Sequence, residues 1–525
     1  MSTTRVVWIF LFLLTAIRLA LIGTTDLSFD EAHYWMWSQS LAPAYFSKGP
    51  GVGFTIWSSV AMFGSNEFGV RFWSPVLAAG TSLLLYYFTR RVFSATTAFW
   101  IVLVANVTPI FNIGSFVMTI DPLSIFFWTA AMFSFWLALE RAPEFSWHWP
   151  LTGLLIGLGF LCKYTNALEL VSVLLVLALV PRLRREFRKP GLYSLGAVFL
   201  FCTIPPIIWN AQHAWATFGH LRSRGNFDRA FGFHPAELLA FLGIHFAIFS
   251  PLLFLGLIWA IVAGWRRARQ QFKRIFLLWF GLPIFILYFV MSINRAANPN
   301  WDGLAFISLS VLAVSYWRER IESRPRMARW AATALVLGLI LSALALDSDL
   351  LQLVGFNFPK HDPADRMRGW KTGARAVEQA RDELEAKLGE KLFVIADERD
   401  RASELSFYFR DKRLAGGWHP PVYIVESQAI LNQFSFWPRY DEFVAAPAKT
   451  PGTEGDVYTE ESGVNPFEGR SALYVQANNK PEPPHNITAA FQSVDEVQTI
   501  EVRRHGQLLR MYQVFLCRNY RTLPL

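Results

Sequence analysis

The chain has 525 residues, of which 53% are hydrophobic, 16% are aromatic and only 17% are charged. This balance is far from that of a soluble domain and predicts a polytopic membrane protein. The net charge of +9 does not indicate a nucleic-acid partner, because the basic residues cluster in short loops between apolar segments, where the positive-inside rule accounts for them. The three cysteines lie far apart in the sequence and offer neither a disulfide framework nor a metal cluster.

The first apolar segment, residues 6–22, has about the length that crosses a bilayer. Arg5 precedes it and no small-residue cleavage site follows before Asp26, so we predict a retained first helix. Further apolar segments bring the expected number of spans to about eleven: 72–89, 96–113, 123–139, 150–162, 166–180, 192–209, 237–263, 275–292, 303–316 and 329–346. An odd number of spans puts the two ends of the chain on opposite sides of the membrane.

Four basic clusters in the connecting loops define the sidedness. In this count all four fall on one side, which the positive-inside rule assigns to the cytoplasm. They begin at Arg90, Arg182, Arg266 and Arg318. The assignment requires that residues 163–166 form a tight outer turn between two short helices, which we favour over one long helix. The segments then expected outside are the loop with Asp30, the turn with Asp121, residues 210–236 and 293–302, and everything after Asp347.

After Leu346 the composition becomes charged and mixed, which predicts a soluble domain. We expect a small α/β unit in it, with helices at 370–389 and 403–409, strands at 391–396, 422–425, 472–476 and 498–502, and loops at 446–468 and 479–485. The sequence therefore predicts a mainly α, multi-pass protein of the inner (plasma) membrane, with a transmembrane domain at 1–346 and an extracytoplasmic (periplasmic) domain at 347–525.

Two adjacent carboxylates, Asp30 and Glu31, follow the first span directly. A lone carboxylate outside a helix end is more often than not only a solvated loop residue. Two adjacent carboxylates make it harder for each other to ionise, and water or nearby cations reduce this repulsion. We interpret the pair as the acidic wall of a site that removes a proton from a hydroxyl group.

Cations occur on the same expected face. Lys48 stands in a turn between Tyr45-Phe46 and Gly49-Pro50, and as a single residue it is as readily a snorkelling interfacial lysine as a ligand. Arg222 and Arg224 are basic residues on the outer side, against the positive-inside trend, and this favours phosphate binding.

Asp121 precedes Pro122 at the start of a span, where a helix cap or first-turn acid explains it as well as a catalytic role does. Four histidines were weighed as metal ligands, but their spacing offers no pair with an acid on one helix face: His213, His220, His234 and His245. We expect no metal and no cofactor.

The order of these motifs resembles a known superfamily. Asp30-Glu31-Ala-His33-Tyr34 leads into Tyr45-Phe-Ser-Lys48-Gly-Pro, and Thr119-Ile-Asp121-Pro and Gly159-Phe-Leu-Cys-Lys163-Tyr-Thr follow. The series resembles the protein mannosyltransferases and lipid A aminoarabinose transferases, which have the C-type (GT-C) membrane glycosyltransferase fold. Asn300-Trp301, Trp209-Asn210 and Arg368-Gly-Trp370 are similar to a bacterial branch, and the likeness covers most of residues 1–410.

The resemblance implies an inverting glycosyltransferase that moves a sugar from a polyprenyl-phosphate carrier to a lipid A, glycan or protein acceptor at the outer face of the inner membrane, among membrane lipids. By this likeness Asp30 matches the acid that activates the acceptor, Lys48 the cation on the carrier phosphate, and Asp121 the second acid of the site. Glu31 joins the catalytic candidates, and Tyr34, Tyr45 and Lys163 join Lys48, Arg222 and Arg224 as candidates for substrate binding. Ser47 and His33 depart from the aminoarabinose transferases, which have an acid and an arginine there, so the sugar stays open.

Two alternatives belong to other classes. A transporter or flippase of lipid-linked sugars would carry ionisable residues at mid-membrane and repeated halves, whereas the acids here stand at span ends and no repeat is visible. A receptor or scaffold built around the soluble tail would leave the loops of Asp30 and Lys48 unexplained.

Overall fold

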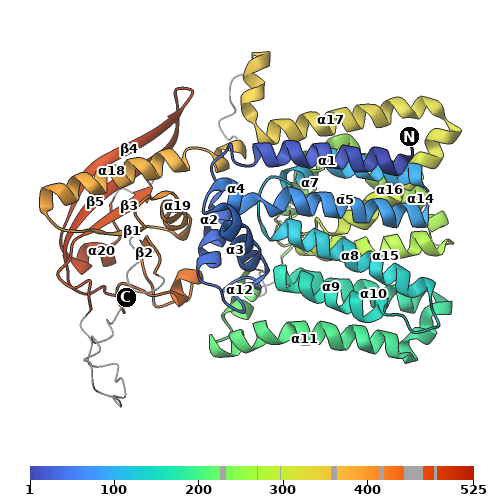
Figure 1. Cartoon of the computed structure of the whole chain (residues 1–525), viewed down its shortest axis with the longest axis horizontal. Helices are drawn as coiled ribbons and strands as arrows, with labels where there is room; N and C mark the ends of the chain where they lie inside the picture. Colours follow the sequence, from blue (N-terminus) through green and yellow to red (C-terminus); the bar gives the residue numbers. More distant parts are fainter. Residues whose placement is uncertain are drawn as a thin grey trace. The chain divides into compact units, whose positions relative to one another are not determined.

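The computed structural model describes the chain except for residues 225–231, 269, 296, 299, 356–362, 413–418, 443–464 and 478–481. It divides into two compact units (Figure 1). We call residues 1–24 and 41–364 the helical unit, and residues 25–40 and 365–525 the sheet unit. The second boundary lies 18 residues beyond the expected end of the transmembrane domain at 346, because 364 − 346 = 18. Most of the loops expected at 446–468 and 479–485 lie outside the described residues.

The helical unit contains apolar helices at all the expected segments. Its α-helices are α1 (Thr3–Leu21), α3 (Gly51–Phe63), α4 (Glu67–Arg71), α5 (Trp73–Val92), α6 (Ala95–Val107), α7 (Pro109–Ile113), α8 (Ile120–Glu140), α9 (His148–Cys162), α10 (Leu168–Leu179), α11 (Pro190–Gln212), α12 (Ala216–Arg224), α13 (Pro235–Ile248), α14 (Pro251–Ala268), α15 (Phe272–Met291), α16 (Ala305–Ser323) and α17 (Ala328–Leu346). Short 3-10 helices are η1 (Tyr164–Ala167), η2 (Pro181–Arg188), η3 (Pro325–Met327) and η4 (Ser348–Val354).

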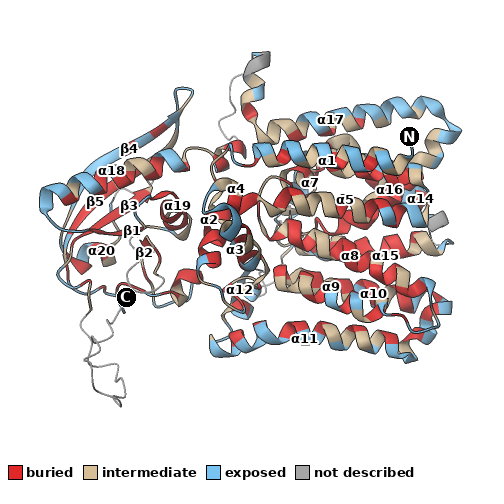
Figure 2. Cartoon of the chain, viewed as in Figure 1, coloured by how far each residue is buried: buried red, intermediate tan, exposed pale blue. Residues whose placement is uncertain are grey.

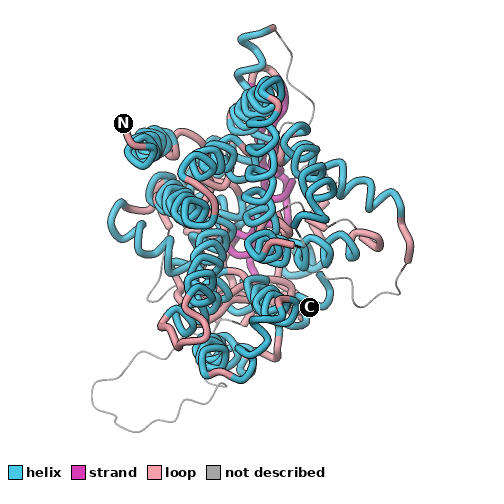
Figure 3. The backbone as a smooth tube through the Cα atoms, turned by 90° about the vertical axis from the view of Figure 1, so that its right-hand side faces the viewer, coloured by secondary structure: helices cyan, strands magenta, loops and turns pink. Residues whose placement is uncertain are grey.

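By length and composition, six helices in the described part of the chain are long and apolar enough to cross a membrane, or up to eight if each bent pair counts as one span. The exact number of eleven therefore stays a prediction. The helix α8 is the most buried of the six, whereas α1 and α17 are largely exposed (Figure 2). In the view of Figure 3, α1 with the N-terminus lies at the periphery of the bundle.

Two expected spans are broken, and that at 96–113 is divided between α6 and α7. The segment expected as a single helix at 237–263 forms α13 and α14, which meet at an angle of 113°. Pro251 is the first residue of α14, and a residue before proline is disfavoured in the α conformation. Ser250 has a φ of 69°, which turns the chain between the two helices. The helix η1 likewise separates α9 from α10, as the predicted turn at 163–166 requires.

The four basic clusters gather at one end of the helical unit. Arg91 pairs with Glu140 at the end of α8, at 2.7 Å. Trp136, one turn earlier, donates to Glu140 and stacks on Phe272, over which Arg182 also lies. The third and fourth clusters meet where Arg274 pairs with Glu319. We call this the basic end. Asp121, in the first turn of α8, is at the other end of a 21-residue helix, roughly 30 Å away at ~1.5 Å per residue.

The sheet unit is built on a five-stranded sheet in the order β2-β1-β3-β5-β4. The strands are β1 (Phe393–Ala396), β2 (Tyr423–Ile424), β3 (Ala472–Ala477), β4 (Phe491–Arg504) and β5 (Gln507–Tyr520), and β1 is parallel to both β2 and β3. The hairpin of β4 and β5 has a two-residue turn, His505-Gly506, and both residues have positive φ, as the tight turns of hairpins require. The helices are α2 (Phe29–Gln39), α18 (Trp370–Leu388), α19 (Arg399–Tyr408) and α20 (His485–Ala490), with 3-10 helices η5 (Pro363–Met367) and η6 (Gln433–Phe436).

The helix α2 belongs to the sheet unit although it follows the first span in sequence. It packs against α19. The backbone N–H of Leu27 donates to the Tyr408 hydroxyl at 2.7 Å, and Trp35 packs edge-on to Phe407 with ring centroids 5.1 Å apart. Residues 31–38 are all buried. The prediction that residues 1–346 form one transmembrane domain differs here, because the partners of α2 lie far along the chain, in α19.

Candidate active site

Asp121 forms the centre of a compact polar cluster in the helical unit. The Lys163 ammonium donates to Asp121 Oδ1 at 2.8 Å and to the Asn300 carbonyl at 3.1 Å. The Asn300 amide donates to Asp121 Oδ2 at 2.8 Å. The side chains of Lys163 and Asp121 are 7% and 21% exposed. We call these three residues the Asp121 cluster, in which both carboxylate oxygens accept a hydrogen bond and the charge is matched.

The local sequence explains how the cluster forms. The Thr119 hydroxyl accepts from the Asp121 N–H and caps α8, so Asp121 enters at the positive end of the helix dipole. Lys163 follows the last residue of α9. Beside the cluster α8 is fastened to η1, the short helix that follows Lys163, because the Asn166 amide donates to the Ser124 carbonyl at 3.0 Å.

The loop that carries Lys48 is held against the end of α9. The backbones of Tyr45 and Lys48 exchange two hydrogen bonds, at 2.9 and 3.4 Å, which makes the turn tight. A β-carbon on Gly49 would overlap the Leu161 carbonyl, and one on Gly51 would overlap the Cys162 sulfur. Glycines at both positions therefore allow the Lys48 loop to contact the residues that directly precede Lys163.

The helix α12 carries Arg222 and Arg224 and joins the same end of the unit. The Thr217 hydroxyl donates to the Tyr45 carbonyl at 3.4 Å, and the rings of Phe46 and His220 are 4.8 Å apart. At its other end, the Arg224 guanidinium lies over the Trp301 ring at 5.7 Å. Because Trp301 follows Asn300, contacts lead from the Lys48 loop through α12 back to the Asp121 cluster.

These contacts link the Lys48 loop, the Asp121 cluster and the helix of Arg222 and Arg224 within the helical unit. That they form one outer site stays a prediction. Tyr45 is fully buried, and its hydroxyl accepts from the Ala42 N–H at 3.3 Å. Burial raises the pKa of the Tyr45 phenol, which keeps it protonated. This position favours a role in shaping the loop over a direct contact with a ligand.

Sequence reasoning missed a second pair next to the cluster. His245 Nε2 and Asp302 Oδ2 are 2.9 Å apart, and both side chains are fully buried. His245 Nδ1 is 2.6 Å from the Phe241 carbonyl, which fixes the ring. The pair anchors Asp302 to α13. Because Asn300 lies two residues before Asp302, the pair also helps to fix the position of Asn300. His245 had been weighed only as a metal ligand; within the described residues no group of three or more His, Cys, Asp or Glu gathers as a metal site would.

Asp30, Glu31 and Tyr34 lie in the sheet unit, on α2. Glu31 forms a capping box, because its carboxylate accepts from the Ser28 N–H at 2.9 Å and the Ser28 hydroxyl at 3.1 Å, and it is fully buried. Tyr34 is buried and packs edge-on to Trp37. Asp30, in the same first turn, is only partly buried. Of the two adjacent acids, Asp30 is the less buried residue.

Comparisons with known proteins relate this arrangement to sugar transfer. The profile of the dolichyl-phosphate-mannose-protein mannosyltransferase family matches residues 47–209. The lipid A galacturonosyltransferase RgtD of Rhizobium johnstonii is 26% identical over 292 residues, 55% of this chain and 60% of its own length. The undecaprenyl phosphate-alpha-4-amino-4-deoxy-L-arabinose arabinosyl transferase of Edwardsiella ictaluri is 27% identical over 54% of this chain and 51% of its own length. The chain thus matches between half and two thirds of the length of these curated relatives.

The fold matches over almost the whole chain. ArnT from Cupriavidus metallidurans, in a crystal structure bound to undecaprenyl phosphate, superposes with a TM-score of 0.62 at 15% identity, over 98% of both chains. The apo structure of the same protein gives a TM-score of 0.58. None of these similarities supports the transporter alternative. The chain is thus similar in sequence to a lipid A galacturonosyltransferase and to undecaprenyl-phosphate aminoarabinose transferases, and it has the fold of ArnT.

Proposed function

We propose that the protein is an inverting glycosyltransferase that moves a sugar from undecaprenyl phosphate, or a similar polyprenyl phosphate, to lipid A. We put lipid A first because a curated relative is by name a lipid A galacturonosyltransferase. A glycan or a protein is the second choice of acceptor. The observation that carries the proposal is the Asp121 cluster, an ion pair joined by contacts to the Lys48 loop and to the two arginines of α12.

The chemistry of such a transfer needs fixed cations and one base. The acceptor oxygen attacks the anomeric carbon, the bond from that carbon to the carrier phosphate breaks, and the phosphate leaves with the electron pair. Lys48, Arg222 and Arg224 stabilise the charge that develops on this phosphate. Lys163 is already paired with Asp121, so we propose that this pair orients the sugar and the loop around it.

For the proton of the acceptor hydroxyl we propose Asp30 as the general base. The proposal rests on the resemblance and on the place of Asp30 in the first turn of α2, where it is less buried than Glu31. Glu31 then supports Asp30 by fixing that turn through the capping box, and Tyr34 supports it by packing within α2.

We also propose that the basic end of the helical unit faces the cytoplasm and that the sheet unit is extracytoplasmic. The positive-inside rule favours this orientation, because four loops rich in arginine share one end.

The donor site is tested with Lys48→Ala in purified protein, by measuring binding of a polyprenyl-phosphate sugar. We expect affinity to fall about tenfold or more, because a charged hydrogen bond contributes ~1.5–3 kcal/mol. Lys48→Arg should retain part of the affinity. The matched control is Lys189→Ala, an exposed lysine at the basic end, which should bind as the parent does. Equal binding by Lys48→Ala and the parent would place the phosphate elsewhere.

The sugar and acceptor are tested by mass spectrometry of lipid A, envelope glycans and glycoproteins from a deletion strain. We expect one sugar to be missing from lipid A. An unchanged set of all three would refute the transfer reaction itself.

A further inference from the structure

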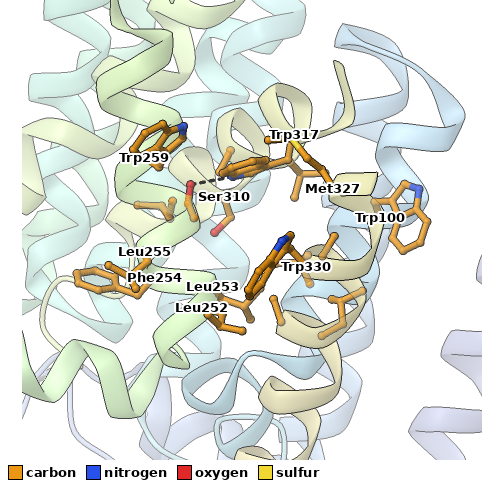
Figure 4. Close-up of a pocket in the computed structure, with 18 of the residues that line it drawn as sticks. Trp100, Leu252, Leu253, Phe254, Leu255, Trp259, Ser310, Trp317, Met327 and Trp330 are labelled. Atoms are coloured by element: carbon orange, nitrogen blue, oxygen red, sulfur yellow. Dashed lines mark hydrogen bonds between the residues drawn. The ribbon is translucent and has the colours of Figure 1, made fainter. Parts of the chain in front are cut away.

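A lateral pocket of about 500 Å³ lies between α6, α14, α16 and α17 in the helical unit (Figure 4). Its volume is in the range of ligand pockets, ~300–1,000 Å³. Four tryptophans from the four helices line it, and we call it the Trp pocket: Trp100, Trp259, Trp317 and Trp330. It is separate from the Asp121 cluster, none of whose residues lines it.

The wall of the Trp pocket is apolar. The Trp317 Nε1–H donates to the Gly256 carbonyl at 2.8 Å, so its polar edge is already satisfied. Trp259 and Trp330 are 61% and 71% exposed and stand on the outer surfaces of α14 and α17. A void of this kind beside a bilayer loses dispersion contacts unless an apolar chain fills it, and lipid chains are the apolar molecules at hand.

Positively charged residues lie at one end of the Trp pocket. Arg318 lines it and pairs with Glu322 at 2.6 Å. Met327 and Ala328 also line it, and the link that carries them holds three exposed arginines, Arg324, Arg326 and Arg329. Toward the Asp121 end, α17 closes onto α6, because the Ser342 hydroxyl donates to the Val107 carbonyl at 3.0 Å.

We propose that the Trp pocket holds an acyl chain of an anionic phospholipid, whose phosphate lies among the arginines of the link between α16 and α17. An apolar pocket that ends beside several arginines fits a lipid with a negatively charged headgroup better than a zwitterionic lipid. The lipid is a resident structural partner and not the sugar carrier, because the arginines belong to the basic end, which is the opposite end of the bundle from the Asp121 cluster. This inference goes beyond the proposed function and does not depend on it.

The experiment is native mass spectrometry of protein taken from membranes in mild detergent, with phosphatidylglycerol and phosphatidylethanolamine added back as probes. The parent should retain phosphatidylglycerol. Ala331→Trp fills the pocket from α17 and should lower retention at least tenfold, whereas Val336→Trp, on an exposed position of the same helix outside the pocket, should not. Arg326→Gln with Arg329→Gln should lower it about tenfold or more, at about fivefold for each charge. Arg188→Gln, an exposed arginine of another basic cluster, should leave it unchanged.

Three outcomes would overturn the proposal. Equal retention of both phospholipids would remove the headgroup preference. A polyprenyl phosphate as the bound lipid would assign the Trp pocket to the sugar donor. Equal retention by Ala331→Trp and Val336→Trp would show that the lipid binds elsewhere. A loss of sugar transfer in Lys48→Ala, by contrast, bears only on the proposed function.

Discussion

Asp121 and Glu140 stand at the two ends of α8, and each is paired with a cation in different surroundings. The side chains of the Asp121–Lys163 pair are 21% and 7% exposed, whereas those of Glu140 and Arg91 are 32% and 55% exposed. Exposed pairs contribute little to stability, but removing one partner of a mostly buried pair leaves the other charge uncompensated. The two acids are therefore a matched test of function within one helix.

We expect Asp121→Asn to lower turnover by ~100-fold or more, as the loss of one fixed electrostatic group at a reacting centre does. Lys163 would lose its charged partner, although the amide oxygen of the new asparagine can still accept a hydrogen bond. Glu140→Gln should turn over within a few-fold of the parent. The measurement is the sugar-transfer rate of the purified variants. The amount of folded protein obtained for each variant is the control for misfolding. Similar rates for both variants would show that Asp121 is only a helix-capping acid.

At Asp30 the neighbouring residue supplies the control. Asp30→Asn keeps the size of the side chain but cannot accept a proton, so turnover should fall by ~100- to 10,000-fold while donor binding is kept. Glu31→Gln should do much less, because glutamine also serves in a capping box. The measurements are turnover and donor affinity of both variants. A nearly normal rate for Asp30→Asn would show that another group is the base.

At the scale of the element, α2 is held by a neutral histidine. Trp37 Nε1–H donates to His33 Nε2 at 3.2 Å, so that nitrogen accepts, and His33 Nδ1 lies 3.1 Å from the Ser403 hydroxyl on α19. The ring also stacks on Phe434 of η6. Burial, and then the charge of Arg399, hold the pKa of His33 well below its usual value.

This histidine predicts that α2 loosens in acid. Above ~pH 6.5 neither the folded nor the unfolded state protonates His33, and its full contribution to stability is present. As the pH falls below that value, the unfolded state takes up a proton that the folded state refuses, so stability is lost toward the lower pKa of the folded form.

The measurement is the hydrogen-exchange protection factor of α2, which is corrected for intrinsic exchange, at about pH 7.5 and about pH 5. We expect lower protection in acid, and His33→Gln should abolish that pH dependence. His485→Gln, an exposed histidine of α20, should leave it intact. Protection that does not change with pH in the parent would refute the mechanism.

The elements that sequence predicted well are those with local signals. The apolar segments became helices, and β1, β3, α18 and α19 lie within a few residues of their predicted places. The break at Ser250 was missed because the apolar composition continues through it. The strand β5 was missed although His505-Gly506 is a turn signal, and the membership of α2 in the sheet unit depends on partners far along the chain, such as Phe407.

The same division holds for the site. Lys48, Asp121 and Arg224 were proposed as charges beside apolar segments and Lys163 through the resemblance, and contacts within the helical unit link the segments that carry them. Asn300 is uncharged and His245 lies inside an apolar segment, so neither carries such a signal, whereas Asp302 stands directly before the segment predicted at 303–316 and was overlooked. Asn300 and Asp121 are 179 residues apart in the sequence, and His245 and Asp302 are 57 apart. Contacts between residues so distant in sequence are established only by the folded structure. The roles of all these residues stay predictions.

At the scale of the whole molecule, orientation is the property to test. Alkaline phosphatase fused after about residue 350 should be active, because the positive-inside rule predicts that the arginine-rich loops of the basic end stay in the cytoplasm. A cytoplasmic reporter fused after Arg188 should be active as well, and serves as the control. An active cytoplasmic reporter after residue 350 would reverse the proposed topology.

The position of α2 in the sheet unit also has a consequence for synthesis. The ribosome makes α2 about 360 residues before α19, since 399 − 39 = 360. At ~5–20 residues per second, the interval lasts roughly 20–70 s. Throughout it, the aromatic surface of Trp35 lacks the packing that Phe407 of α19 provides. A chain that stalls or is truncated before Arg399 therefore displays an unsatisfied hydrophobic segment, which marks it for chaperones and proteases.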